Sequence, residues 1–243
     1  MSTSGISIVI PAYNEEAYLP GTLGAINEAR ARFESATGLS SEMVVVNNAS
    51  TDKTAEVALA HGAIVVDHHV RNISAVRNAG IHRSLHGLIV TIDADSLLPA
   101  DGLVKIWEVM SDGRLIGGAL GVTLITDKLS KKILAGIILT LAAYTSGING
   151  AMFFFRKDDA LAIGGFDENK LTAEDAAFAI ALRRHGRKHG KKFTRLKTVK
   201  VATADRKDLS VRSIIPLISL AIRAFAGQKQ TQEELGFWYK PKR

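Results

Sequence analysis

Two carboxylates stand one residue apart at the end of an apolar run. Residues 88–93 read LIVTID, and Asp93 is followed by Ala94 and Asp95. A buried carboxylate is costly unless it is paired, hydrogen-bonded or bound to a metal, and alternate residues of an extended chain point to the same side. Hard cations such as Mg²⁺ and Mn²⁺ take carboxylate oxygens and keep water or substrate phosphates as further ligands. The pair therefore indicates a divalent-cation site at the end of a strand.

Polar residues also follow two earlier apolar runs. The run at 6–11 continues into Ala12, Tyr13, Asn14 and Glu15. The run at 42–48 ends in two asparagines and continues into Ala49, Ser50, Thr51 and Asp52. Because ligands bind beyond the carboxyl ends of strands in open parallel sheets, these endings predict a site on one rim of the sheet. The chain contains no Gly-x-x-x-x-Gly-Lys and no Gly-x-Gly-x-x-Gly motif, so no glycine loop for phosphate is indicated. A diphosphate would have to be held by the metal.

A third acidic motif opens a helical pattern near residue 174. Glu174 and Asp175 precede an apolar stretch of helical spacing, and negative charges are favourable at a helix N-terminus. A capping role at the start of this helix is by itself a sufficient explanation for the two acidic residues. The functional alternative is that one of the two carboxylates is a general base that takes a proton from an attacking hydroxyl.

Strand and helix patterns alternate in the first half of the chain. Near-continuous apolar runs are typical of strands covered on both faces, and their alternation with helices implies right-handed βαβ units and a parallel sheet. The sequence predicts strands at 6–11, 42–48, 63–68 and 88–93. It predicts one helix capped by Asn14, a second from Thr51 or Asp52 to His61, and a third from Ser74 to His86 that ends before Gly87.

The second half of the chain is less regular. Strands are predicted at 117–125 and 151–156, and an apolar helix at 129–144. A further helix is predicted from about 173 to 184, closed by His185-Gly186, followed by an edge strand or hairpin at 191–203. With no internal repeat and no low-complexity linker, we expect one Rossmann-like α/β domain over residues 1–205. Residues 206–243 would form a basic, amphipathic appendage.

Composition and charge exclude several classes of protein. The 243 residues include no cysteine, which excludes disulfides, thiolate zinc sites and cysteine nucleophiles. The net charge of +7 is uneven, because residues 183–243 carry 17 Lys and Arg against 4 Asp and Glu. The longest apolar stretches, 133–144 and 213–225, fall short of the roughly 18–20 residues that span a bilayer. We therefore expect a cytoplasmic protein without a transmembrane helix.

Taken together, the motifs resemble those of the family 2 glycosyltransferases of GT-A fold. The resemblance covers residues 5–190, with the motifs in the order of the family. It rests on SIVIPAYNEE (7–16), VVVNNASTDKTAEVA (44–58), SAVRNAGI (74–81), DAD (93–95), AMFFFRKDDALAIGGFDE (151–168) and AED (173–175). It implies a GT-A fold with a mostly parallel central sheet flanked by helices, and a metal-dependent, inverting transfer of a sugar from a nucleotide-sugar donor.

The resemblance also implies roles for individual residues. Asp175 would be the catalytic base and Asp95 the ligand of a Mn²⁺ or Mg²⁺ ion, with the Gly164-Gly165 turn shaping the acceptor pocket. The nucleotide-sugar site would be formed by Pro11, Ala12, Tyr13, Glu15, Asn47, Arg77, Asp93, Ala94 and Glu174. Within that set Asn47 would bind the base edge and Arg77 would lie against the nucleotide.

The sequence departs from the family pattern in two places. Asn47-Asn48 stands where many members have Asp-Asp, which leaves the base of the donor open, with a UDP-sugar favoured. The Gln-x-x-Arg-Trp motif of processive synthases does not occur. Alternatives of other classes are a catalytically impaired nucleotide-sugar-binding protein of the same fold, a nucleotidyltransferase, and a nucleic-acid-binding module. The last is disfavoured because the basic region has few aromatic residues and no recognisable module.

The partners follow from the same reasoning. We expect a nucleotide-sugar donor, a glycan or lipid-linked acceptor, and no nucleic acid. The amphipathic stretch 209–225 is apolar on most sides and flanked by basic residues, which is typical either of a segment at a membrane interface or of a homodimer contact. If the stretch lies at a membrane interface, the protein would be a peripheral membrane protein on the inner face of the membrane.

Overall fold

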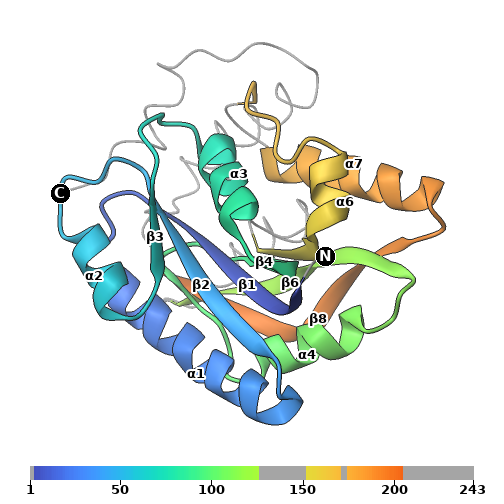
Figure 1. Ribbon diagram of the computed structural model, residues 1–243, viewed down its shortest axis with the longest axis horizontal. Coiled ribbons are helices and arrows are strands. Elements are labelled where there is room, and N and C mark those ends of the chain that lie inside the picture. Colours follow the sequence, from blue (N-terminus) through green and yellow to red (C-terminus); the bar gives the residue numbers. More distant parts are fainter. Residues whose placement is uncertain (1–2, 126–151, 171–173, 205–243) are drawn as a thin grey trace.

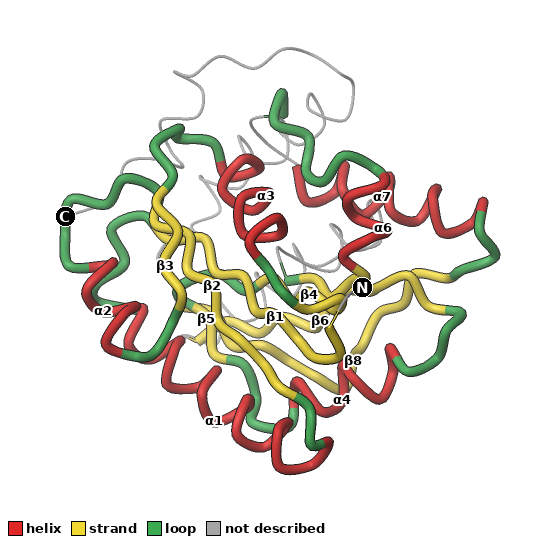
Figure 2. Tube along the Cα trace, viewed as in Figure 1, coloured by secondary structure: helices red, strands yellow, loops and turns green. Residues whose placement is uncertain are grey.

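The chain folds around a mixed β-sheet with helices on both faces (Figures 1 and 2). The computed structural model describes residues 3–125, 152–170 and 174–204. The predicted helix 129–144 and the stretch 209–225, with the rest of the appendage 206–243, lie outside the described residues. In the described part of the chain no helix is long and apolar enough to cross a membrane.

The sheet combines a parallel half with a mixed half. Its strands within the described residues are β1 (Thr3–Ala12), β2 (Ser40–Asn47), β3 (Ile64–Asp67), β4 (His86–Thr91), β5 (Ser96–Leu97), β6 (Leu115–Ile125), β7 (Phe153–Arg156) and β8 (Lys192–Ala204), in the order β3-β2-β1-β4-β7-β6-β8-β5. β1 to β4 pair in parallel, as the alternating pattern predicted. β7 is antiparallel to both β4 and β6 and joins the two halves.

Helices cover both faces of this sheet. The helices of the described residues are α1 (Leu19–Thr37), α2 (Thr54–Ala60), α3 (Ile73–Arg83), α4 (Gly102–Met110), α6 (Lys157–Ala162) and α7 (Glu174–Lys188). Figure 1 shows α3, α6 and α7 on one face and α1, α2 and α4 on the other. The α/β fold class predicted from the sequence is confirmed.

Alternation along the strands supplies a separate core to each face. In β7, Phe154 packs with α1 and α4, whereas Phe153 and Phe155 pack with α7 on the opposite side. All three phenylalanines are fully buried. Because successive strand residues point to opposite faces, a run that is apolar throughout requires cover on both, and this is why FFFR lies inside the sheet.

Three helix boundaries predicted from the sequence are wrong. Asn14 caps no helix, because it adopts a positive φ of 54° and α1 starts only at Leu19. Gly87 lies within β4 and Gly186 within α7, so neither glycine ends a helix. β8 is one strand that pairs with β6 along its length, and among the described residues β5 covers its outer edge only at Ala202 and Thr203. The sequence reasoning also missed α4 and α6.

Helix α3 lies close to the sheet because a glycine faces it. A Cβ atom at Gly80 would stand 2.3 Å from Cγ1 of Val9 and 3.1 Å from Cγ2 of Val46, and both valines are fully buried. The absence of a side chain at this position therefore sets how closely α3, which carries Arg77, approaches β1 and β2.

Replacing Gly80 with alanine should destabilise the fold, although alanine is the better helix former. Overpacking a core typically costs about 1–3 kcal/mol, which exceeds the gain of about 1 kcal/mol in helix propensity. Gly24→Ala on α1 is the matched control, because a Cβ there meets nothing within 4 Å, and it should raise stability. Urea unfolding of both variants tests this, and equal shifts of the two midpoints would contradict the packing argument.

Candidate active site

A pocket of about 270 Å³ opens at the carboxyl ends of β1 and β4. We call it the strand-end pocket. It is lined by Pro11, Ala12, Tyr13, Glu15, Asn48, Arg71, Ile73, Val76, Asp93, Ala94 and Asp95. Seven of these residues belong to the site predicted from the sequence, and the location agrees with the rule for open α/β sheets.

Hydrogen bonds between two loops fix one wall of this pocket. The backbone N–H of Glu15 donates to Oγ1 of Thr54 at 2.7 Å, and the backbone N–H of Thr51 donates to Oδ1 of Asn14 at 2.8 Å. The N–H of Asn14 donates to Oγ of Ser50 at 3.1 Å. The polar ending of β2 therefore holds the turn that presents Tyr13 and Glu15, which explains why polar residues follow both strands.

Asn48 occupies the position in the pocket that the sequence reasoning gave to Asn47. The side chain of Asn47 turns away, because its Nδ2 donates to Oδ1 of Asp67 at 2.8 Å and its Oδ1 accepts from the N–H of Ser50 at 3.2 Å. Asn48 lines the pocket and donates to the carbonyl oxygens of His68 and Val70. The contact of Asn47 with the nucleotide base stays a prediction. The geometry favours Asn48 for that contact, because Asn48 lines the pocket and Asn47 does not.

Arg71 is a pocket residue that the sequence reasoning missed. Its guanidinium lies 4.8 Å from the centroid of the Tyr13 ring, and it lines the pocket with Tyr13. Its position in the sequence, immediately before Asn72, could have indicated it. The side chain of Asn72 accepts a hydrogen bond from the N–H of Ala75 and caps α3. The residue before such a cap stands at the sheet rim, where α3 begins.

Arg77 lies beneath the pocket and binds three carboxylates. Its side chain is 3% exposed, and it does not line the strand-end pocket. Its Nη1 contacts Asp175 at 2.6 Å and Glu174 at 3.1 Å, and its Nη2 contacts Asp93 at 3.2 Å. We call these four residues the Arg77 cluster. The geometry links Arg77 to the acidic side chains, whereas the resemblance had implied that it lies against the nucleotide.

One guanidinium cannot neutralise three carboxylates, and the pKa values reflect this. Burial together with the charges of Glu174 and Asp93 raises the pKa of Asp175 to about 8, against the opposing effect of Arg77. Desolvation also raises the pKa of Asp93, opposed by Arg77 and reinforced by Asp95. The carboxylates raise the pKa of Arg77 although its burial acts the other way. The cluster therefore carries excess negative charge and holds a carboxyl group suited to proton transfer near neutral pH.

The acidic residues at the pocket fit a hard divalent cation. Asp95 lines the pocket, and carboxylate oxygen is the donor that Mg²⁺ and Mn²⁺ prefer. Within residues 3–125, 152–170 and 174–204, no group of three His, Cys, Asp or Glu side chains could hold a metal ion by itself. An ion bound at Asp95 would therefore need water or substrate oxygen as further ligands, which is the usual arrangement for Mg²⁺ with phosphates.

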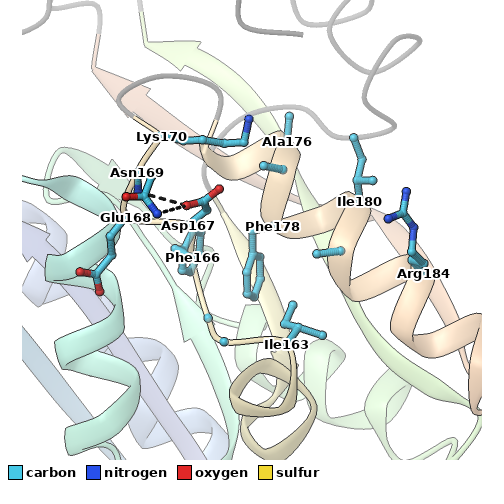
Figure 3. Close-up of a pocket in the computed structure, with 14 residues that line it drawn as sticks. Ile163, Phe166, Asp167, Glu168, Asn169, Lys170, Ala176, Phe178, Ile180 and Arg184 are labelled. Atoms are coloured by element: carbon cyan, nitrogen blue, oxygen red, sulfur yellow. Dashed lines mark hydrogen bonds between the residues drawn. The ribbon is translucent and has the colours of Figure 1, made fainter. Parts of the chain in front are cut away.

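A second pocket, of about 660 Å³, lies along α7 and the loop before it (Figure 3). Its walls include Phe166 and Phe178, whose rings stack with centroids 4.0 Å apart, and Ile180. Gly164 and Gly165 also line it, and the role of their turn in shaping an acceptor pocket stays a prediction. Gly165 has a φ of 73°, and a Cβ there would meet Oδ1 of Asn78 at 2.4 Å. Ala176 lines the pocket directly after Asp175, so the helix that carries the acidic pair also borders this second cavity.

Comparison with known proteins relates the chain to one family. Residues 7–164 match the family model described as Glycosyl transferase family 2. An uncharacterized glycosyltransferase of Mycobacterium tuberculosis is 32% identical over 113 residues, which are 46% of this chain and 47% of the relative. An undecaprenyl-phosphate 4-deoxy-4-formamido-L-arabinose transferase of Pseudomonas paraeruginosa is 31% identical over 123 residues, 47% of this chain and 35% of the relative. The match thus spans about half of these relatives' length or less.

Solved structures share the fold at low sequence identity. A mannosyltransferase of Pyrobaculum calidifontis in complex with GDP-Man and Mn²⁺ superposes with a TM-score of 0.67 at 17% identity, covering 95% of this chain and 66% of the other. TarS of S. aureus in complex with UDP-GlcNAc gives 0.66 at 15% identity, covering 90% and 66%. A glucosyl-3-phosphoglycerate synthase of M. tuberculosis with Mn²⁺ and UDP-Glc gives 0.62 at 15% identity, covering 95% and 81%. The predicted GT-A architecture is confirmed by these matches.

Proposed function

This chain belongs to glycosyl transferase family 2, and from that premise we propose that it transfers a sugar from a nucleoside diphosphate sugar to an acceptor hydroxyl. The observation that carries the proposal is the Arg77 cluster. Through one buried guanidinium, Asp175 at the start of α7 is tied to Asp93 in the wall of the strand-end pocket. A proton acceptor thus lies beside a pocket of the kind that binds nucleotides in open α/β sheets.

In the proposed reaction Asp175 is the general base. The acceptor oxygen attacks the anomeric carbon of the donor while a carboxylate oxygen of Asp175 takes its proton. The bond from the anomeric carbon to the diphosphate breaks, and its electron pair leaves with the nucleoside diphosphate. A single displacement of this kind inverts the anomeric centre. A divalent ion held by Asp95, when bound, would stabilise the charge of the leaving diphosphate as a Lewis acid.

The strand-end pocket is the proposed donor site. Pro11, Ala12 and Tyr13 would contact the nucleoside and Asp93 the ribose, with Glu15 and Ala94 completing the walls and Glu174 bordering the sugar. We propose a UDP-sugar as donor. The solved structures of the fold with UDP-GlcNAc or UDP-Glc support this choice, and the structure with GDP-Man makes a GDP-sugar the competitor to test.

The acceptor is proposed to be a glycan or a lipid-linked molecule. The similarity to an undecaprenyl-phosphate transferase supports the lipid-linked class, and the apolar wall of the second pocket offers a surface for it. Liposome flotation of the full chain and of a chain ending at residue 205 tests whether the appendage contributes membrane contact. Equal flotation of the two would count against that contact.

A thermal-shift screen with UDP-, GDP- and dTDP-sugars, each with and without Mn²⁺, tests the donor proposal. We expect stabilisation by one nucleotide class that depends on the metal. Donor binding without turnover on any acceptor would favour a catalytically impaired binding protein instead. No stabilisation by any nucleotide would contradict the proposed function as a whole.

Replacing Asp95 with alanine should remove the metal-dependent part of that stabilisation. The substitution deletes the carboxylate proposed to hold the ion, so the shift in the melting temperature caused by the donor should become the same with and without Mn²⁺. Asp158→Asn is the control, because Asp158 is an exposed carboxylate in the first turn of α6. An Asp95→Ala variant that keeps the full Mn²⁺ effect would exclude Asp95 as the ligand.

The rate of transfer should fall on the acid side of about pH 8. Asp175 acts as a base only when it is deprotonated, and its pKa is raised to about 8 in the free protein. Since kcat/KM reports ionisations of the free enzyme, it should rise about tenfold per pH unit below that value and level off above it. A plateau that extends down to pH 6 would contradict either the role of Asp175 or its raised pKa.

A further inference from the structure

The end of β8 lies directly against the Asp93–Asp95 turn. Oγ1 of Thr203 donates to Oδ1 of Asp95 at 3.3 Å, and the backbone N–H of Ala204 donates to the carbonyl oxygen of Asp95 at 3.1 Å. Oγ of Ser96 lies 3.1 Å from Oγ1 of Thr203 and 3.2 Å from Oδ1 of Asp95. Side chain and backbone of Asp95 are thus both held by a strand more than one hundred residues further along the chain.

The two hydroxyl groups can form an ordered relay. Each hydroxyl has one proton to donate and can accept as well. If Thr203 donates to Asp95, then Ser96 can donate to Thr203, and chains of hydrogen bonds of this kind strengthen each other in a buried setting. Ser96 is fully buried, so its hydroxyl has no competing bulk water. The relay therefore restrains Oδ1 of the Asp95 carboxylate before any ligand binds.

The position of Thr203 follows from the short pairing of β5 with β8. The register pairs Ser96 with Thr203 and Leu97 with Ala202 in antiparallel orientation. Thr203 does not line the strand-end pocket, so it can influence a bound ion only through Asp95. Residues that orient the ligands of a metal commonly change its affinity 10–100-fold when they are replaced.

We infer that Thr203 is a positioning residue for the metal-binding carboxylate Asp95, with Ser96 as its hydrogen-bond donor. The inference rests on the proposed function, because it takes Asp95 as the metal ligand. The hydroxyl of Thr203, a β8 residue that is distant from Asp95 in the sequence but contacts it in the fold, would thus set the affinity of the donor site for the divalent cation.

The test measures Mn²⁺ affinity of the full-length chain by electron paramagnetic resonance of the free ion, in the presence of UDP and separately of GDP. Thr203→Val removes the hydroxyl and keeps the shape of the side chain, whereas Thr203→Ser keeps the hydroxyl. We expect Thr203→Val to weaken Mn²⁺ binding about tenfold, because Ser96 can still donate to Asp95. Thr203→Ser should bind nearly as the natural chain does. The double variant Ser96→Ala, Thr203→Val should approach a 100-fold loss.

Two further measurements separate this role from a general loss of structure. Thr123→Val, at an exposed position of the neighbouring strand β6, should leave Mn²⁺ affinity unchanged. The thermal midpoint of Thr203→Val without ligand should stay within a few degrees of the natural chain. Unchanged Mn²⁺ affinity in both Thr203→Val and the double variant would overturn the inference and leave the proposed function standing. Failure of the natural chain to bind Mn²⁺ with either nucleotide would instead contradict the proposed function.

Discussion

Replacing Asp175 with asparagine should reduce transfer activity by about 10²–10⁴-fold while leaving donor binding intact. General acid–base catalysis contributes an effect of this size, and the amide of asparagine is no base at neutral pH. Because asparagine keeps the shape and one acceptor oxygen, its contact with Nη1 of Arg77, 2.6 Å in the natural chain, can persist. The strand-end pocket does not include Asp175, so donor affinity should be unchanged. Radiolabelled sugar transfer and thermal shift with the donor provide the two measurements.

Glu174→Gln is the matched control for this prediction. Glu174 lies next in the chain and contacts the same Nη1 atom of Arg77 at 3.1 Å, so any general disturbance of the cluster affects both variants. We expect a clearly smaller loss of activity for Glu174→Gln. If the two variants lose activity equally, the base has to be reassigned. If Asp175→Asn loses donor binding, its role is structural.

Replacing Arg77 with methionine should give the largest loss of stability of any substitution considered for this chain. The change leaves the carboxylates of Asp93, Glu174 and Asp175 beside each other without their common partner. Breaking a buried ion pair by removing one side costs about 3–5 kcal/mol, which corresponds to a drop of roughly 6–20 °C in Tm for a domain of this size. Part of the loss also comes from the contact of the guanidinium with the Phe166 ring, 5.3 Å away.

The loss of stability in Arg77→Met should be smaller at about pH 8 than at about pH 10. Without the guanidinium, the pKa of Asp175 rises further above its value of about 8 in the natural chain, so in this range the folded variant keeps a proton that the unfolded chain and the folded natural chain have released. Stability of the variant relative to the natural chain should therefore increase as the pH falls from about 10 towards 8. Thermal unfolding across this range is the measurement. Arg114→Met is the control, because that arginine pairs with Asp112 at the surface, and it should leave the midpoint unchanged.

Local sequence patterns were sufficient for the parallel half of the sheet. Runs such as 6–11 and 42–48 are nearly continuous apolar stretches, which are typical of a strand with cover on both faces. The acidic pair at the end of the fourth run could be assigned to the pocket rim for the same reason, since the carboxyl ends of parallel strands meet at one edge. The boundaries of helices were less predictable. At Asn14 the loop after β2 supplies hydrogen bonds that replace a helix cap, and no local pattern reveals that loop.

Contacts between distant parts of the chain were decided only by the tertiary structure. β7 enters the sheet antiparallel between β4 and β6, and a strand pattern contains no information on its neighbours or its direction. Arg77 was predicted as a site residue, but its partners lie 16 to 98 residues away, and only the folded chain brings them to its side chain. Thr203 reaches Asp95 through a two-residue pairing of β5 with β8.

The sequence by itself therefore predicted which side chains could carry the chemistry, because type and strand position are local properties. Only the folded chain decided which of them touch, because that depends on the order and register of the strands.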